Sequence, residues 1–380
     1  MPKITIITTI DHNVGDDFVR EGIIYLLKRV LGEFQTELIH KHIPLTVRPE
    51  MEWFYTSGLS RILDRLPRCK GLFWSRVMDR LPVNYSTDKI HTCSLLVQSG
   101  APVYWEDAHL NEWYYPLIRK RWMAKKYNVP FINIGAGTCQ PYNSDGSDII
   151  TNAKCAQYIK ELYRNCSITT LRDTLSKSIL NKLGLEAPVI PCPSIFARDN
   201  LGILPNTPQY VALNFMPIGG HYRYDSGFLA QEWEDNFKQF YYSMKKQSPV
   251  LLVCHSAKEY EAAARIDPES NRFIGKTAKD YLEIYSKAKY FIGCRVHAAF
   301  ATASFGRPGF VIGNDTRALM TSEIGLKSVL VNNATAEVLA NAAFELEASR
   351  TDYSIAFNAI KEKALQEYIQ VLSPLNNYFK

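Results

Sequence analysis

Arg295 and His297 lie two residues apart, in a stretch whose residue types suit the binding of an anion. The sequence predicts a buried strand over 290–293 and a helix of small residues over 298–304, so both side chains stand where a strand gives way to a helix. Helix N-termini favour anions, and a guanidinium binds phosphate or carboxylate through two hydrogen bonds. An imidazole there can carry a proton near neutral pH. The other interpretation, an arginine–carboxylate ion pair beside a structural histidine, is equally open at this point.

The elements that position this stretch follow a repeated pattern, in which a short apolar strand runs into a loop and then a helix. Strands of this type are predicted at 3–10, 94–98, 130–134, 167–170, 210–214, 249–253, 290–293 and 310–312. The pattern is typical of parallel sheets, which bind ligands at the carboxyl ends of their strands. We therefore predict an α/β fold with two Rossmann-like domains that face a cleft.

Length and proline content predict the domain boundaries. A chain of 380 residues is too long to fold around a single ordinary hydrophobic core, so two domains are expected. Five prolines in 187–208 indicate the connection, so an N-terminal α/β domain would span 1–186 and a C-terminal α/β domain 209–350. The tail at 351–380 is expected to form a helix that packs back across both domains.

The composition, with 46% hydrophobic and 22% charged residues, is that of a folded globular protein. Most of the formal net charge of +6 falls on residues 1–200, which suits anionic ligands but, without any nucleic-acid-binding motif, predicts no binding of nucleic acid. Scattered cysteines, no signal-peptide pattern and no long apolar run predict a cytoplasmic protein. The aromatic and basic segment 53–85 is interpreted as helices on the first domain, with peripheral contact at the cytoplasmic membrane as the alternative.

Three blocks of sequence, at 13–17, 171–196 and 295–308, together resemble the polysaccharide pyruvyl transferase family. They contain Asn-x-Gly-Asp-Asp, then Leu-Arg-Asp followed by Pro-x-x-Phe, and finally Arg-x-His before an alanine-rich helix and Gly-x-Pro. The resemblance implies a glycosyltransferase-B type fold and transfer of the enolpyruvyl group of phosphoenolpyruvate onto two hydroxyls of a sugar, which forms a pyruvyl ketal and releases phosphate. The sugar would belong to a bacterial surface polysaccharide, such as a capsule or exopolysaccharide, or to its lipid-linked precursor. Neither a metal nor another cofactor would be required.

By position, the resemblance assigns phosphoenolpyruvate binding to Arg172, Arg295 and His297, and it makes His297 the leading acid or base. Arg317 stands near the place where the family often has a lysine, so we expect it to complete the group of cations around the donor. The loop at 99–101 contains less glycine than the family pattern, which leaves its contacts open.

Six residues near the other loops are weaker candidates for contacts with the sugar acceptor, namely Asp16, Asp17, Trp105, His109, His221 and Arg223. Aromatic rings and polar side chains of these types are common in clefts that hold sugars. For Asp16 and Asp17, capping of a helix N-terminus is the favoured interpretation. His255 also ends a predicted strand, and we expect a structural role for it.

Two other functions are compatible with the same residues. A nucleotide-sugar-dependent glycosyltransferase of this fold would use Arg295 and Arg317 to hold a diphosphate and would ignore phosphoenolpyruvate. A non-catalytic protein that binds a glycan or an anion would show no turnover, and His297 would be dispensable in it.

Overall fold

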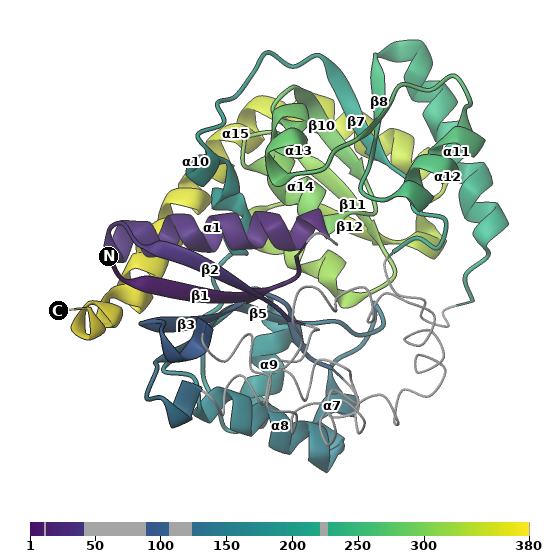
Figure 1. Cartoon of the computed structure of the whole chain (residues 1–380). Helices are drawn as coiled ribbons and strands as arrows, with labels where there is room; N and C mark the ends of the chain where they lie inside the picture. Colours follow the sequence, from purple (N-terminus) through teal and green to yellow (C-terminus); the bar gives the residue numbers. More distant parts are fainter. Residues whose placement is uncertain (11–12, 42–88, 106–123, 221–226, 380) are drawn as a thin grey trace, which may run out of the picture.

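The computed structural model describes residues 1–10, 13–41, 89–105, 124–220 and 227–379, which form two parallel six-stranded sheets (Figure 1). The first sheet contains β1 (Lys3–Thr8), β2 (Gln35–His40), β3 (Leu95–Ser99), β4 (Pro102–Tyr104), β5 (Phe131–Thr138) and β6 (Ile168–Leu171). The second contains β7 (Tyr210–Asn214), β8 (Val250–Cys254), β9 (Arg272–Ile274), β10 (Ala288–Gly293), β11 (Gly309–Gly313) and β12 (Lys327–Leu330). The predicted α/β class is therefore confirmed.

In the first sheet the strands run in the order β2-β1-β3-β5-β4, and β6 pairs with β5. Because β1 lies between two partners, Ile4 stands opposite Thr36 on one side and Leu95 on the other. A strand that is covered on both faces needs apolar or β-branched residues, and β1 has them at every position after Lys3. The helices of this half include α1 (Val14–Leu31), α7 (Ser147–Thr151), α8 (Ala153–Arg164) and α9 (Thr174–Lys182).

In the second sheet the strands run in the order β12-β11-β10-β7-β8-β9. Its helices include α11 (Ala230–Gln247), α12 (Ala257–Ile266), α13 (Ala278–Tyr285) and α14 (Val296–Ala303). Since the strands are parallel, their carboxyl ends meet at one edge of the sheet. His255, which follows β8, and Arg295, which follows β10, therefore lie at the same edge.

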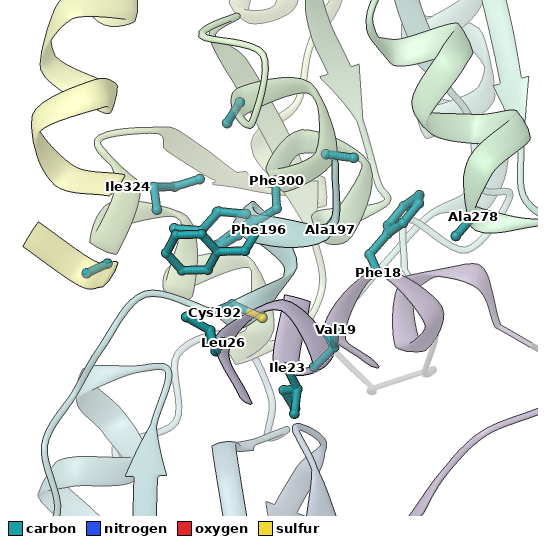
Figure 2. Packing of buried hydrophobic residues seen from close by; sticks show 14 of the residues in the cluster. Phe18, Val19, Ile23, Leu26, Cys192, Phe196, Ala197, Ala278, Phe300 and Ile324 are labelled. Carbon is teal, nitrogen blue, oxygen red and sulfur yellow. The ribbon is translucent and has the colours of Figure 1, made fainter. Parts of the chain in front are cut away.

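Helix α1 packs between the two halves of the chain. Figure 2 shows Phe18 and Ile23 of α1 together with Phe196 and Phe300, which come from different parts of the chain. These four side chains are at most 1% exposed and belong to one continuous apolar cluster. Burial of this size contributes strongly to stability, so the shared core fixes one sheet relative to the other.

Part of the segment 187–208, which the sequence predicts as a connection, is built into this core. It contains the 3₁₀ turn η4 (Pro193–Phe196) and the helix α10 (Ala197–Leu201). Gly22 of α1 approaches η4 so closely that a Cβ added there would lie 1.8 Å from the carbonyl oxygen of Pro193. This part of the connection therefore holds α1 in place, whereas most of residues 202–208 are exposed.

The last helix, α15 (Ala336–Leu372), begins well before the expected tail segment and runs past both halves of the chain (Figure 1). Its Lys361 forms an ion pair with Asp199 at 2.6 Å. Further along, the hydroxyl of Tyr368 donates to the carbonyl oxygen of Pro191 at 3.0 Å. Both contacts attach the C-terminal helix to the connection around α10.

Candidate active site

A cavity lies between the two halves of the chain, where α1 and α14 begin. The N-terminal half lines it with Asn13, Gly15, Asp16, Pro102 and Arg172. The C-terminal half lines it with Met216, Gly220, His255, Cys294, Arg295, Val296, His297, Gly313, Asp315, Arg317, Ala318 and Met320. The fold thus brings together Arg172, Arg295 and His297, which the family resemblance assigns to the donor, and Arg317, which we expected to complete the group.

His297 lies in the first turn of α14 and is held from two sides. Its Nε2 is 3.8 Å from Sγ of Cys192. Its Nδ1 lies against Gly15, where an added Cβ would come within 2.7 Å of it, so only glycine leaves room for the imidazole. Burial, together with the positive charge of Arg172, lowers the pKa of His297 to about 3. The imidazole is therefore neutral at physiological pH, with a lone pair on one of its ring nitrogens.

Arg172 follows β6, and only 1% of it is exposed. Its Nε and Nη1 atoms are buried and have no hydrogen-bond partner within the described part of the chain. Gly137 of β5 makes room for the side chain, because a Cβ there would lie 2.6 Å from Nε. The neighbouring Asp173 caps α9 by accepting the N–H of Ser176 at 2.7 Å. A buried cation that lacks partners is costly, so Arg172 indicates that an anion binds in the cavity.

Arg295 precedes α14 and forms an ion pair with Glu259 of α12. Its Nε donates to Oε1 of Glu259 at 3.1 Å, and Nη2 donates to the same oxygen. Although burial alone would raise it, the positive charge of Arg295 lowers the pKa of Glu259 to about 2. The ion-pair interpretation is confirmed for Arg295, whose charge is compensated even though the residue lines the cavity.

Arg317 lies in the 3₁₀ segment η5 (Thr316–Ile324) and is also paired. Its Nε and Nη2 donate to the two carboxylate oxygens of Asp315 at 2.8 and 2.6 Å. The adjacent Thr316 joins the two halves of the chain, because its N–H donates to the carbonyl oxygen of Gln140 at 2.9 Å and its hydroxyl accepts the N–H of Gln140 at 3.0 Å. Two of the three arginines in the cavity therefore carry their own counterion.

Asp16 and Asp17 lie in the first turn of α1, but neither is the cap of this helix. The cap is Asn13, whose side chain accepts a backbone N–H at 3.1 Å. Asp16 lines the cavity and accepts a hydrogen bond from Nζ of the buried Lys41 at 2.8 Å. Burial by itself would raise the pKa of the Asp16 carboxyl, but the positive charge of Lys41 holds this pKa far below its usual value. Asp17 does not line the cavity; it pairs with Arg20, and burial raises the pKa of Asp17 to about 6.

Of the other predicted acceptor contacts, only Trp105 belongs to the described residues, and it does not line the cavity. Trp105 follows β4 and donates its indole N–H to the carbonyl oxygen of Pro102, but only Pro102 lines the cavity. His109, His221 and Arg223 lie outside the described residues, as does the aromatic and basic segment 53–85.

His255 is a cavity residue that the sequence interpretation treated as structural. Its Nε2 lies 2.7 Å from the hydroxyl of Tyr285, and its backbone N–H donates to Glu259 at 3.0 Å. Burial and the positive charge of Arg295 lower the pKa of His255 to about 3. The signal that points to it is its position, directly after a strand that ends at the same edge as β10.

The start of α14 adds a further anion-binding feature. The helix has no side-chain cap, so the first N–H groups are not taken up by its own side chains. These N–H groups and the helix dipole add positive potential beside Arg172. The cavity therefore suits an anionic ligand.

Within the described ranges, no group of three or more His, Cys, Asp or Glu side chains is placed to hold a metal ion. A search of the helices in the same ranges finds none with the length and apolar character to cross a membrane.

The sequence profile of the polysaccharide pyruvyl transferase family matches residues 13–316, and the chain belongs to this family of transferases. No curated protein matches the sequence. Solved structures with a similar fold include UDP-GlcNAc 2-epimerase from Neisseria meningitidis bound to UDP-GlcNAc, with a TM-score of 0.53, 10% identity, and coverage of 98% of this chain and 99% of that one. The S. aureus MnaA–UDP co-structure has a TM-score of 0.51, 12% identity, and coverage of 94% and 91%. These likenesses concern the fold alone, and they confirm the predicted glycosyltransferase-B type.

Proposed function

We propose that this chain transfers the pyruvyl group of phosphoenolpyruvate onto two hydroxyls of a sugar, forming a pyruvyl ketal and releasing phosphate. The observation that carries the proposal is Arg172, a buried guanidinium in the cavity whose Nε and Nη1 lack partners among the described residues. Phosphoenolpyruvate has a carboxylate and a phosphate, with roughly three negative charges, and guanidinium binds either group through two hydrogen bonds. The acceptor would be a bacterial surface glycan or its lipid-linked precursor, and the reaction would use no cofactor.

The donor would be held by groups from both halves of the chain. Arg172 would bind one anionic group, and the N–H groups at the start of α14 would bind the other. Arg295 uses Nε and Nη2 for Glu259, which leaves its Nη1 for the ligand. Such donors also stabilise the negative charge that develops on phosphate as it departs.

His297 would act first as a base, because its imidazole is neutral in the free protein. It would take the proton of the first sugar hydroxyl as that oxygen bonds to the central carbon of phosphoenolpyruvate, and it would then give the proton to the terminal methylene. Phosphate would leave from the resulting tetrahedral adduct as the second hydroxyl oxygen bonds to the same carbon. His297 would therefore act as the general acid after it has acted as the base.

Ligand-induced stabilisation tests the donor. A ligand that binds only the native state adds RT ln(1 + [L]/Kd) to stability, about 2.7 kcal/mol at a hundredfold excess over Kd. We expect phosphoenolpyruvate to raise the thermal midpoint of the wild type and of Arg198→Met, but not of Arg172→Met. Arg198 is a matched control, because its Nε and Nη1 also lack hydrogen-bond partners within the described ranges, yet it lies outside the cavity lining.

A nucleotide-sugar-dependent glycosyltransferase is the alternative, because the open start of α14 and three arginines also suit a diphosphate. UDP-GlcNAc and GDP-mannose in the same experiment separate the two functions. A shift of the midpoint with nucleotide sugars alone would contradict the pyruvyl transferase assignment.

A further inference from the structure

We propose that His255 is a second proton-accepting residue of this cavity and takes the proton of the second sugar hydroxyl, whereas His297 takes that of the first. This inference rests on the proposed function. A ketal joins two former hydroxyl oxygens to one carbon, so two protons must be removed from the acceptor in the course of one turnover.

The carboxylates and the thiol of the described cavity lining are not available as proton acceptors. The carboxylates of Asp16 and Asp315 accept hydrogen bonds from Lys41 and Arg317. Burial raises the pKa of the Cys294 thiol to about 12, so the thiol keeps its proton. Among these lining residues, the two imidazoles are the neutral side chains whose ring nitrogens offer a lone pair to a substrate proton.

The hydrogen bond of His255 leaves one ring nitrogen for a substrate. Nε2 is bound to the Tyr285 hydroxyl, while Nδ1 makes no hydrogen bond to a described residue and is not one of the fully buried polar atoms. His297 has the same arrangement, with Nε2 beside Cys192 and Nδ1 beside Gly15 at the cavity.

Tyr285 suits both protonation states of His255. Its hydroxyl can donate to Nε2 of the neutral ring, or accept from Nε2–H once Nδ1 has gained a proton. Burial holds the pKa of Tyr285 well above its ordinary value, so the hydroxyl keeps its own proton in either state.

The groups around His255 come from three elements. Tyr281 of α13 lies with its ring centroid 4.6 Å from that of the imidazole, and Glu259 of α12 and Arg295 at the start of α14 form an ion pair beside it. A positive charge on His255 lowers the pKa of His297. The two imidazoles therefore disfavour simultaneous protonation and would act one after the other.

The proton transfers balance. In the first step a carbon–oxygen bond forms at the central carbon, the carbon–carbon π bond breaks, and the first hydroxyl proton passes through His297 to the methylene, which becomes a methyl group. In the second step the bond to phosphate breaks and phosphate leaves with the electron pair. The second hydroxyl oxygen bonds to the same carbon and its proton moves to Nδ1 of His255, which then releases it to phosphate or water.

The test compares His255→Gln with wild type. The Gln amide can keep a hydrogen bond to Tyr285 but cannot accept a proton. The assay supplies phosphoenolpyruvate and a panel of p-nitrophenyl hexosides, and it measures ketal by mass spectrometry and pyruvate and phosphate enzymatically. We expect ketal formation to fall about 10²–10⁴-fold, while stabilisation by phosphoenolpyruvate is kept. Water then captures the tetrahedral adduct and yields pyruvate, phosphate and the unchanged sugar, so the ratio of pyruvate to ketal rises.

Two further variants separate chemistry from folding. Tyr285→Phe keeps the imidazole but removes its partner, and we expect the ratio of pyruvate to ketal to shift in the same direction by a smaller factor. His91→Gln alters an exposed histidine outside the cavity lining and should leave the ratio unchanged.

Failure of the inference and failure of the proposed function give different results. If wild type forms no ketal and releases no phosphate with any of these sugars, the proposed function is contradicted. If wild type forms ketal and His255→Gln does so at the same rate and ratio, only the role of His255 is overturned. An equal loss of ketal and pyruvate in His255→Gln, with an unchanged ratio in Tyr285→Phe, would also overturn it.

Discussion

Replacement of Arg172 by Met should stabilise the free protein while it removes binding of phosphoenolpyruvate. The Nε and Nη1 atoms are buried without hydrogen-bond partners in the described chain, and each unsatisfied buried polar group costs about 1–3 kcal/mol. Met fills much of the space of the guanidinium stem without polar atoms. Asp173 loses the favourable charge of its neighbour, which offsets part of the gain. We expect a net increase of about 2 kcal/mol in the free energy of unfolding.

Arg295→Met is the matched control and should act in the opposite direction. Its partner Glu259 has a side chain only 3% exposed, and removal of Arg295 leaves that carboxylate buried without a counterion. Loss of one partner of a buried ion pair costs about 3–5 kcal/mol. We thus expect Arg172→Met to raise the free energy of unfolding and Arg295→Met to lower it, although both residues line the same cavity.

Denaturant-induced unfolding at neutral pH measures both effects, with and without phosphoenolpyruvate. Arg172→Met should unfold at a higher denaturant concentration than wild type, and addition of phosphoenolpyruvate should not change it. A variant as unstable as Arg295→Met would show that the Arg172 guanidinium is satisfied in the free protein, and it would refute this reasoning.

Three more predictions follow from the packing and the pKa values. Gly15→Ala places a Cβ 2.7 Å from Nδ1 of His297, so turnover should fall at least about tenfold, with the circular dichroism of the fold kept; unchanged turnover would contradict this contact. Gly22→Ala meets the Pro193 carbonyl oxygen at 1.8 Å and should cost about 1–3 kcal/mol, whereas Gly309→Ala, whose nearest contact is 3.4 Å, should unfold at nearly the wild-type denaturant midpoint. Below pH 6.5 the unfolded state binds more protons than the native state, because the two cavity histidines have native pKa values of about 3 against 6.5. Stability should therefore fall as the pH is lowered from 6.5, by up to about 2 kcal/mol per histidine near pH 5, and a flat profile would contradict the lowered pKa values.

The central strands could be predicted from the sequence because they are buried on both faces. β1, β3 and β10 are almost entirely buried, and their high content of apolar and β-branched residues gives a clear signal. The strands that were not predicted, such as β2 and β12, lie at the edges of their sheets, begin with polar residues and contain only two apolar residues each.

The positions of the cavity residues could be predicted, but their charge states could not. Arg172, Arg295 and His297 follow strands, and the carboxyl ends of parallel strands meet. The counterion of Arg295 lies 36 residues away on another helix, and no local pattern reveals it. The contact of His297 with Gly15 likewise depends on how the two halves pack.

The most direct test of the central claim offers the protein both kinds of donor with the same acceptors. Purified protein is incubated with aryl hexosides and either phosphoenolpyruvate or UDP-GlcNAc, and the masses of the glycosides and the released phosphate are measured. The account predicts a glycoside that gains one pyruvyl ketal, in an amount equal to the phosphate released, with phosphoenolpyruvate alone. A glycoside extended by a sugar from UDP-GlcNAc, with phosphoenolpyruvate unconsumed, would contradict it.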